Sequence, residues 1–339
     1  MKDIPLVGIT MGDPSGIGPE IIVKTLADPA ICDLCRPVVL GDGGVISRFR
    51  TVTPKPSIRE ISDPSQAEGK QGQIDLISAC SLDRDRIVPG VPVVEGGQAM
   101  VACIVRAVAL AKAGEIAAVV TCPISKVLMQ EAGHCFEGHT QLIAHLTNCQ
   151  DYVMMLAGKT LRVALVTIHC ALRDVPANLT KEGIRKTIAI SGRALRDDFA
   201  VERPRLAVAA LNPHAGESGL FGSEESVLIA PAIEEARKEG FLVDGPMPPD
   251  TVFYKAAAGH YDAVVAMYHD QGLIPLKLLH FSDAVNVTLG LPIIRTSVDH
   301  GTAYDIAGQD VADPSSLKAA IRMAVFMAKN RARKVSKVS

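Results

Sequence analysis

Three of the nine histidines in this 339-residue sequence stand directly after a short apolar run. His169 follows residues 163–168, His214 follows residues 206–213, and His269 follows residues 263–268. Apolar runs of this length that end in polar residues are typical of buried parallel strands. In an open α/β sheet, ligands bind at the carboxyl ends of the strands. If the three strands are neighbours, three imidazoles therefore converge on one point.

Three converging imidazoles would form a metal site. Neutral imidazoles without an obligatory carboxylate suit zinc, cobalt, nickel or manganese better than magnesium or calcium. Three protein ligands leave positions open for a substrate, which is the layout of a catalytic site. The alternative for each histidine is a hydrogen-bonded polar residue at a sheet edge, but the matched placement of three favours the metal. The histidines without such placement are predicted to be surface or packing residues: His134, His145, His260 and His280.

The elements that must position these histidines alternate between short β-branched runs and longer helical periods. This alternation predicts a mostly parallel, doubly wound sheet. Strands are predicted at residues 6–11, 37–40, 117–121, 162–168, 205–211, 262–267 and 284–287. Helices are predicted at residues 98–113, 140–147, 181–196, 223–239 and 314–328. Prolines break residues 51–97 into short pieces, which predicts an irregular surface excursion or a small antiparallel unit.

Composition narrows the class of protein. The length favours two packed lobes, and a 48% apolar content excludes disorder for most of the chain. A net charge of −2 shows no excess of positive charge of the kind that binds nucleic acid. The start of the chain has no secretory signal, and the strongest apolar helix candidate, residues 98–113, is too short to span a bilayer. We therefore expect a cytoplasmic protein with neither a membrane nor a nucleic acid as partner.

The eight cysteines are accordingly expected to be reduced. Cys32 and Cys35 form a CxxC pair, but no second pair follows at zinc-ribbon spacing. These two and the six scattered cysteines are predicted to be small packing side chains. Cys122 and Cys170 are distinguished only by their chemically interesting neighbours.

Other predicted strand ends are also polar. Residues 12–20, GDPSGIGPE, form a Gly-rich turn into a helix, which suits either an anion held by backbone N–H groups or a tight structural turn. Thr140 has the residue type of a helix N-cap, which would explain its presence before an apolar helical period. An N-cap does not explain the neighbouring His139. Lys277 and Arg295 are suited to a phosphate or a carboxylate, with solvent-exposed charge as the alternative.

Several motifs carry a resemblance to known dehydrogenases. Residues 300–308, HGTAYDIAG, resemble the adenosine-binding loop of isocitrate and isopropylmalate dehydrogenases. The chain resembles more closely the 4-hydroxythreonine-4-phosphate dehydrogenase family of vitamin B6 biosynthesis, almost from end to end. The motifs that match, in order, are MGDPSGIGPE near residue 11, GHT at 138, LNPHAGE at 211, YHDQG at 268 and NVTLGLPIIRTSVDHGT from 286.

The resemblance implies a fold and a division of the chain. The expected fold is a two-lobed isocitrate/isopropylmalate dehydrogenase-like α/β/α fold, with mostly parallel sheets and a central cleft. Residues 1–128 plus 305–339 would form the first lobe. Residues 129–304 would form the second lobe, which carries the metal ligands and the interface of a homodimer whose subunits share the active site.

The resemblance also implies roles for individual residues. The expected divalent-metal ligands, for zinc, cobalt, magnesium or manganese, are His169, His214 and His269. The expected substrate-binding residues are His139, Thr140, Lys277, Asn286 and Arg295. The expected NAD or NADP loop contains His300, Gly301, Thr302 and Asp305. Asp250 matches a polar position near the site, and Lys277 is the candidate for helping proton transfer.

The implied reaction is oxidation of 4-phosphooxy-L-threonine at its C3 hydroxyl to a β-keto acid, which loses CO2 to give 3-amino-2-oxopropyl phosphate. Close relatives oxidise 4-phospho-D-threonate or 4-phospho-D-erythronate instead, and the same three histidines would serve them. From a different class, three histidines also suit a zinc hydrolase, although a hydrolase has no use for an adenosine site. A non-enzymatic sensor is the remaining alternative.

Overall fold

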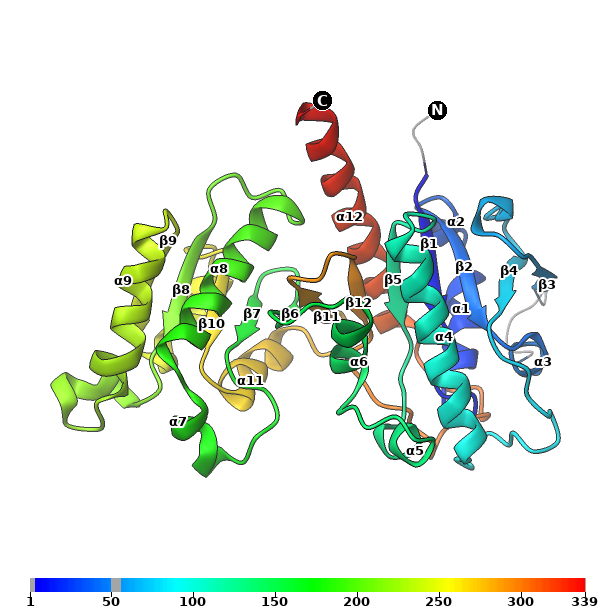
Figure 1. Cartoon of the computed structure of the whole chain (residues 1–339), viewed down its shortest axis with the longest axis horizontal. Helices are drawn as coiled ribbons and strands as arrows, with labels where there is room; N and C mark the ends of the chain where they lie inside the picture. The colour runs from blue at the N-terminus through cyan, green and yellow to red at the C-terminus, as the bar shows by residue number, and fades with distance from the viewer. Residues whose placement is uncertain (1–3, 50–55, 339) are drawn as a thin grey trace. The chain divides into compact units, whose positions relative to one another are not determined.

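The computed structural model describes residues 4–49 and 56–338, which form two compact units. Unit 1 consists of Met1–Gln150 and Leu291–Lys329, and unit 2 consists of Asp151–Gly290 and Asn330–Ser339. The mostly parallel α/β architecture predicted from the alternating pattern is confirmed in both units. Figure 1 shows the elements of each.

The sheet of unit 1 has the strand order β3-β4-β2-β1-β5-β12, and every neighbouring pair is parallel. Its strands are β1 (Leu6–Thr10), β2 (Arg36–Gly41), β3 (Ser57–Glu60), β4 (Gln73–Ser78), β5 (Ala118–Thr121) and β12 (Arg295–Ser297). Its helices are α1 (Gly18–Leu26), α2 (Pro29–Cys32), α3 (Gly43–Ile46), η1 (Pro64–Gln66), α4 (Val94–Lys112), α5 (Lys126–Glu131), α6 (His139–Leu146) and most of α12 (Ser315–Val338). The right-handed βαβ crossovers of such a sheet place helices on both faces.

The sheet of unit 2 has the strand order β11-β6-β7-β10-β8-β9. Strand β6 is antiparallel to both of its neighbours, whereas β7, β10, β8 and β9 run parallel. The strands are β6 (Val153–Ala157), β7 (Arg162–Leu165), β8 (Arg205–Ala209), β9 (Leu242–Met247), β10 (Ala263–Ala266) and β11 (Val285–Leu289). The helices are η2 (Leu172–Asp174), α7 (Val175–Asn178), α8 (Lys181–Asp197), η3 (Pro213–Gly219), η4 (Glu225–Ile229), α9 (Ala230–Lys238), α10 (Pro249–Ala257) and α11 (His269–Leu279).

The boundaries between the units lie at residues 150 and 291, not at the predicted 128 and 305. Two contacts explain the difference. Strand β12 pairs with β5 in parallel, and α6 packs against α4, so both segments belong to unit 1. The last residues belong to unit 2 because Arg331 Nε donates to Asp198 Oδ1 at 2.5 Å and Asn330 Nδ2 donates to the Asp198 carbonyl at 2.9 Å. Helix α12 continues beyond these contacts to Val338.

Helix α4 is the central helix of unit 1. It has 19 residues, so by length and composition alone it could cross a membrane. The sequence prediction of a helix over residues 98–113, too short to span a bilayer, was therefore wrong about its length. In the fold, α4 covers one face of the sheet and contacts β1, β2 and β5 (Figure 1). Its buried residues include Ala99, Met100, Ile104, Ala107 and Val108. This burial is typical of a core helix of a soluble protein.

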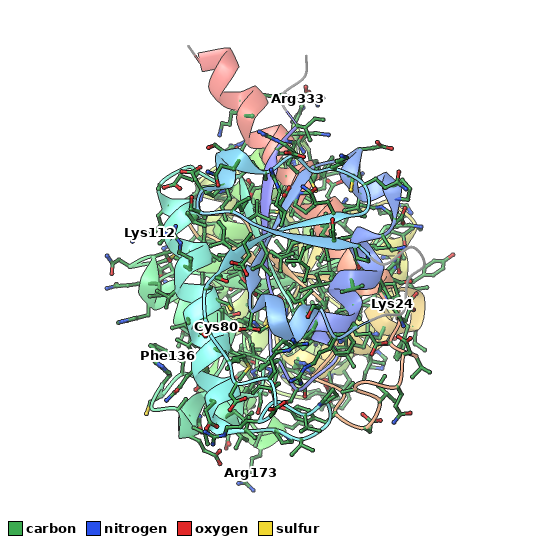
Figure 2. All side chains as sticks on the ribbon, turned by 90° about the vertical axis from the view of Figure 1, so that its right-hand side faces the viewer. Lys24, Cys80, Lys112, Phe136, Arg173 and Arg333 are labelled. Carbon is green, nitrogen blue, oxygen red and sulfur yellow. The ribbon has the colours of Figure 1, made fainter. Side chains whose placement is uncertain are left out.

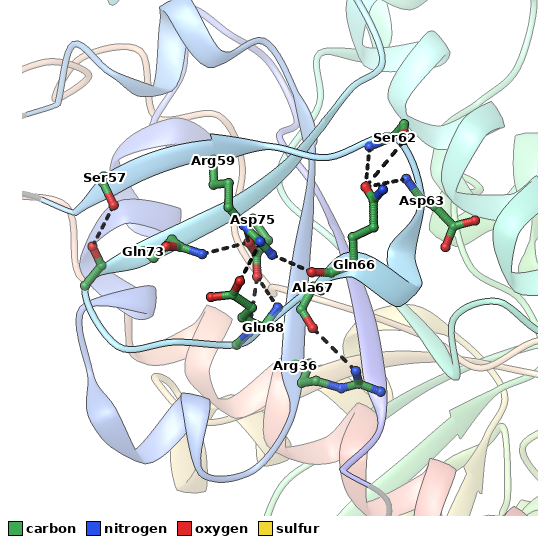
Figure 3. A network of polar contacts seen from close by, with 12 residues as sticks. Arg36, Ser57, Arg59, Ser62, Asp63, Gln66, Ala67, Glu68, Gln73 and Asp75 are labelled. Carbon is green, nitrogen blue, oxygen red and sulfur yellow. Dashed lines mark hydrogen bonds and ion pairs between the residues drawn. The ribbon is translucent and has the colours of Figure 1, made fainter.

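The segment predicted as an irregular excursion contributes β3 and β4 to the unit 1 sheet, and the two are parallel rather than antiparallel. Residues 51–55 lie outside the described residues. A single buried carboxylate, Asp75, organises the connection between the strands (Figure 3). Asp75 Oδ1 accepts from Arg59 Nε at 2.7 Å, and Oδ2 accepts from the Glu68 amide at 2.8 Å and the Gly69 amide at 3.1 Å.

Replacing Asp75 with alanine is expected to destabilise unit 1 strongly. The change leaves Arg59 Nε and two backbone amides without their acceptor, although Arg59 Nη1 keeps its bond to Glu68, and the expected loss is about 2–4 kcal/mol. Chemical denaturation of Asp75→Ala measures this loss. Asp63→Ala, which removes an exposed cap in the same connection, is the matched control and should lower the midpoint much less. An equal effect of the two variants would contradict the role of Asp75.

Candidate active site

The three strands that precede the predicted metal ligands are direct neighbours. Strand β10 lies between β7 and β8, with Val264 opposite Val163 on one side and Ala207 on the other. All three run parallel, so His169, His214 and His269 follow the carboxyl ends of adjacent strands. The strand adjacency, which is the condition for the three imidazoles to converge, is therefore present.

His169 and His269 lie together at this edge. The ladder between β7 and β10 continues past the strands, because the Val166 amide donates to the Ala266 carbonyl at 2.9 Å and the Thr167 amide to the Met267 carbonyl at 3.2 Å. The two imidazole rings have centroids 5.8 Å apart. The His269 ring is also held by Asp270, whose Oδ1 lies 2.7 Å from His269 Nδ1. That contact leaves Nε2 of His269 as the nitrogen available to a ligand.

Gln271 is a positioning residue that the sequence analysis missed. Its side chain is 9% exposed, accepts from the Met267 amide at 2.7 Å and donates to the Ala210 carbonyl at 2.7 Å. These bonds tie the end of β10 to the end of β8, and thereby fix the backbones that carry His269 and His214. The signal in the sequence is an amide in the YHDQG motif, two residues after the predicted ligand.

His214 begins a turn of left-handed backbone. Residues 214–219 all have positive φ, from 43° at Glu217 to 97° at Gly219. For a residue with a side chain this conformation costs roughly 1 kcal/mol, so the surrounding structure must hold the turn. Glu225 does so, because its Oε1 accepts from the amides of Leu211 and Asn212 at 2.9 and 2.7 Å. Such backbone strain is concentrated at functional sites.

Two of the three predicted ligands are thus assembled within one chain. In residues 4–49 and 56–338, no three histidine, cysteine, aspartate or glutamate side chains gather closely enough to hold a metal ion. The His214 ring instead lies 6.4 Å from the ring of Phe221, centroid to centroid. The His169–His269 pair fits two ligands of one ion, and His214 stands on the adjacent strand end.

Unit 2 also contains three of the other predicted residues. Lys277 lies near the end of α11, with Nζ 6.0 Å from the centroid of the Phe281 ring. Asn286 lies on β11, and its Oδ1 is buried without a hydrogen-bond partner among the described residues. Asp250 is exposed in the first turn of α10, a helix that contacts the turn of His214.

The remaining predicted substrate residues meet at the carboxyl end of β5 in unit 1. Arg295 is 2% exposed, and its Nη2 donates to Thr121 Oγ1 at 2.8 Å. Burial lowers the pKa of Arg295 to about 9, so the guanidinium remains charged at neutral pH. Burial, and then the charge of Arg295, hold the pKa of His139 well below its ordinary value, although a bond to the Cys122 backbone opposes them. A neutral imidazole thus lies beside a buried cation.

His139 Nε2 is buried and has no hydrogen-bond partner among the described residues. Thr140 is the next residue of α6, which begins at His139. The N-cap of α6 is Gly138, and no side chain makes a capping hydrogen bond there. The prediction that Thr140 is the N-cap is therefore wrong. A buried guanidinium can bind an anionic group of a ligand. The neutral imidazole beside it can accept a hydrogen bond from a neighbouring hydroxyl of that ligand, or donate one to it.

The Gly-rich turn after β1 is a structural turn, the second of its two interpretations. The Asp13 amide donates to the Pro123 carbonyl, Ser15 to Asp13 Oδ1, Gly16 to the Asp13 carbonyl, and Ile17 to the Thr302 carbonyl. These N–H groups are therefore not available to an anion. The turn instead holds the loop of residues 299–312.

Two side chains of the motif complete this attachment. Tyr304 Oη donates to Asp13 Oδ2 at 2.5 Å, and Glu20 Oε1 accepts from the Ala312 amide at 2.8 Å. Burial and the contact with Asp13 raise the pKa of Tyr304 to about 12. The predicted cofactor residues lie in this loop: His300, Gly301 and Asp305 are exposed, and Thr302 is half-buried. Residues 304–310 form consecutive turns.

The buried Asp13 is expected to make stability depend on pH. Burial raises its pKa above 3.8, and the bonds from Tyr304 and Ser15 only partly offset this. A carboxyl whose pKa is raised in the folded state stabilises the fold at low pH, and the contribution is lost as pH rises through the folded-state value. Relative to the native chain, the Asp13→Asn variant should therefore become more stable, with a larger free energy of unfolding, as pH increases from about 4. Urea denaturation across this range measures the difference, and a difference independent of pH would contradict the prediction.

The two cysteines beside the site differ in access to solvent. Cys122 is fully buried, and burial raises the pKa of its thiol, which disfavours the reactive thiolate. Cys170 is exposed next to His169.

Comparisons with known proteins agree with this architecture. The family model described as "Pyridoxal phosphate biosynthetic protein PdxA" matches residues 33–324. The 4-hydroxythreonine-4-phosphate dehydrogenase of Desulfosudis oleivorans is 54% identical over 97% of each chain, and that of Desulforapulum autotrophicum is 52% identical over 96% of each. D-threonate 4-phosphate dehydrogenase of Salmonella typhimurium is 44% identical over 95% of this chain and 98% of its own.

A solved structure, 4-hydroxythreonine-4-phosphate dehydrogenase from Klebsiella pneumoniae, has a TM-score of 0.88 and 44% identity, and the match covers 96% of this chain and 99% of the other. The fold and these relatives define the class as an α/β oxidoreductase that acts on a CH–OH group. Within that class, the chain belongs to the PdxA family of pyridoxal phosphate biosynthesis.

Proposed function

We propose that this chain oxidises 4-phosphooxy-L-threonine with NAD or NADP and one divalent metal ion. The C3–OH group loses a hydride and a proton to give a β-keto acid, and loss of its carboxylate as CO2 gives 3-amino-2-oxopropyl phosphate. The observation that supports this best is the placement of His169, His269 and His214 after the adjacent parallel strands β7, β10 and β8.

His169, His214 and His269 would hold the metal, for which zinc, cobalt, magnesium and manganese are the candidates. When bound, a divalent metal acts as a Lewis acid on a hydroxyl or carbonyl oxygen. Neutral imidazoles fit this role, and the 5.8 Å separation of the His169 and His269 rings supports it. Asp270 orients His269 through Nδ1, as partners of metal-bound histidines commonly do.

The substrate would be bound by His139, Thr140, Lys277, Asn286 and Arg295. The Arg295 guanidinium and the Lys277 ammonium supply the positive charge that a phosphate and a carboxylate require. Asn286 Oδ1 and His139 Nε2 are buried without a hydrogen-bond partner among the described residues, and a bound ligand would supply one. Lys277 would also assist proton transfer from the reacting hydroxyl. His300, Gly301, Thr302 and Asp305 would bind the adenosine of a nicotinamide cofactor, which would supply the hydride acceptor when bound.

Turnover of three phosphorylated acids tests the substrate. Formation of the reduced nicotinamide is measured with 4-phosphooxy-L-threonine, 4-phospho-D-threonate and 4-phospho-D-erythronate at equal concentrations, with metal added. We expect the highest kcat/KM for 4-phosphooxy-L-threonine, because relatives with that name reach 54% identity and those named for D-threonate 4-phosphate reach 44%. Faster turnover of the threonate would assign the chain to the second group.

We also propose a homodimer that completes the active site, in the cytoplasm. Helix α11 carries an exposed apolar stripe that continues beyond its end, with Ile274, Leu278 and Phe281 exposed by 60%, 82% and 82%. Three large apolar side chains at this spacing indicate a protein interface. A partner subunit on this helix, which begins at His269, would bring a further ligand to the pair of histidines.

Replacing Leu278 with glutamate is expected to produce a monomer with at least about tenfold less activity, because the buried charge is not paired. Sedimentation velocity and a rate assay measure the two effects. Val227→Glu, at a 61% exposed residue of η4 in the same unit, is the control. A variant that is both dimeric and active would contradict the assignment of this face.

A further inference from the structure

Two cysteines that are far apart in the sequence meet in unit 1. Cys80 follows β4 and Cys103 lies in α4, and their Sγ atoms are 4.0 Å apart. The CxxC pair behaves differently, because the Cys35 thiol donates to the Ile31 carbonyl at 3.6 Å. The fold therefore brings together a thiol pair that the spacing in the sequence did not indicate.

The two thiols differ in access to solvent. Cys80 is half-buried and lines a surface cavity of about 330 Å³ between the segment of residues 79–87 and the first half of α4. Figure 2 labels Cys80 on the face of unit 1 that is turned toward the viewer. Cys103 has no exposed surface and lies behind Cys80. The contact with Cys80 and burial raise the pKa of the Cys103 thiol well above its ordinary value. An incoming reagent thus meets Cys80 first.

We propose that Cys80 and Cys103 are a reversible modification site that takes a low-molecular-weight disulfide, RSSR. The Cys80 thiolate attacks one sulfur of RSSR, the S–S bond breaks, and one RSH leaves, which produces a mixed disulfide. The Cys103 thiol then loses its proton and its sulfur attacks Cys80 Sγ, which releases the second RSH. In total, the two protein thiols lose two electrons and two protons, and RSSR gains them as two RSH.

The geometry permits the second step. A disulfide requires an S–S distance of about 2 Å, so the two sulfurs, which are 4.0 Å apart, must approach by about 2 Å. The product would link the segment after β4 to the middle of α4. The first turn of α4 lies against the Asp13–Pro14 turn, because a Cβ on Gly96 would meet Pro14 Cγ at 3.3 Å. The bond would therefore brace the part of unit 1 that supports the loop of residues 299–312.

Oxidised glutathione is a suitable probe at a pH of about 8.5, where free thiols are half ionised. The full-length protein is incubated with it, free thiols are alkylated, and peptides are mapped by mass spectrometry. We expect a Cys80–Cys103 cross-link that dithiothreitol reverses and a thermal transition that rises by several degrees. Cys103→Ser should stop at a glutathione adduct on Cys80, and Cys80→Ser should leave Cys103 unmodified. Cys32→Ser is the matched control and should cross-link like the native chain.

Other products would overturn the proposal. One is a native chain that retains glutathione on Cys80 while Cys103 remains free after prolonged incubation. Another is a cross-link from Cys80 to any other cysteine. Because the readout is covalent connectivity, the result does not depend on the proposed reaction of the enzyme.

Discussion

His269→Ala is expected to lose most of its bound metal and to lower kcat by at least about a hundredfold, since changes even to partners of metal ligands cost 10–100-fold. His269 lies at the centre of the three strand ends, with the His169 ring 5.8 Å away. Its removal leaves at most two of the three proposed ligands, and Asp270 loses the imidazole that it orients. The fold should be retained, because the side chain of His269 is 37% exposed and covers little of the core.

Metal content by elemental analysis and the steady-state rate measure the two losses together. His260→Ala is the matched control, since His260 is an exposed histidine of the same unit on the loop after α10. This control should keep both metal and rate. A His269→Ala protein that keeps native metal content and native rate would show that the three strand-end histidines do not form the metal site.

Arg295→Met is expected to lower kcat/KM by roughly two to three orders of magnitude, mainly through KM. Hydrogen bonds to a charged group contribute about 1.5–3 kcal/mol each, and every 1.4 kcal/mol is about tenfold in affinity. The guanidinium is buried beside Thr121 and His139, so water would not replace the lost charge for an incoming anion. Arg295→Lys keeps the charge but loses the planar fork, and its defect should be intermediate.

Inorganic phosphate provides a second readout for this site. It should inhibit the native enzyme competitively and inhibit Arg295→Met much less, whereas a defect of folding alone would leave the inhibition constant unchanged in the folded fraction. Arg36→Lys controls for the loss of a guanidinium elsewhere in unit 1, where Arg36 donates to the Ala67 carbonyl. Native KM in Arg295→Met would exclude Arg295 from substrate binding.

The order and spacing of residues predicted much of the fold. All seven predicted strands are present, because β-branched runs such as those of β1 and β10 are buried on both faces and carry their own signal. Five strands were missed: β3, β4, β6, β9 and β12. Of these, β9 contains Gly245 and Pro246, and β12 has only three residues. Such segments become strands through pairing with a neighbour, which local periodicity does not record.

The candidate site divides in the same way. By itself, the sequence determined that three histidines follow short apolar, strand-forming runs, because residue type and hydrophobic pattern are local properties. Only the tertiary structure decided that β7, β10 and β8 are adjacent, that Gln271 joins two of their ends, and that the Gly-rich turn uses its amides internally. Those contacts join residues far apart in the chain. The same applies to Cys80 and Cys103, whose sulfurs meet because the segment after β4 lies beside α4 in one unit.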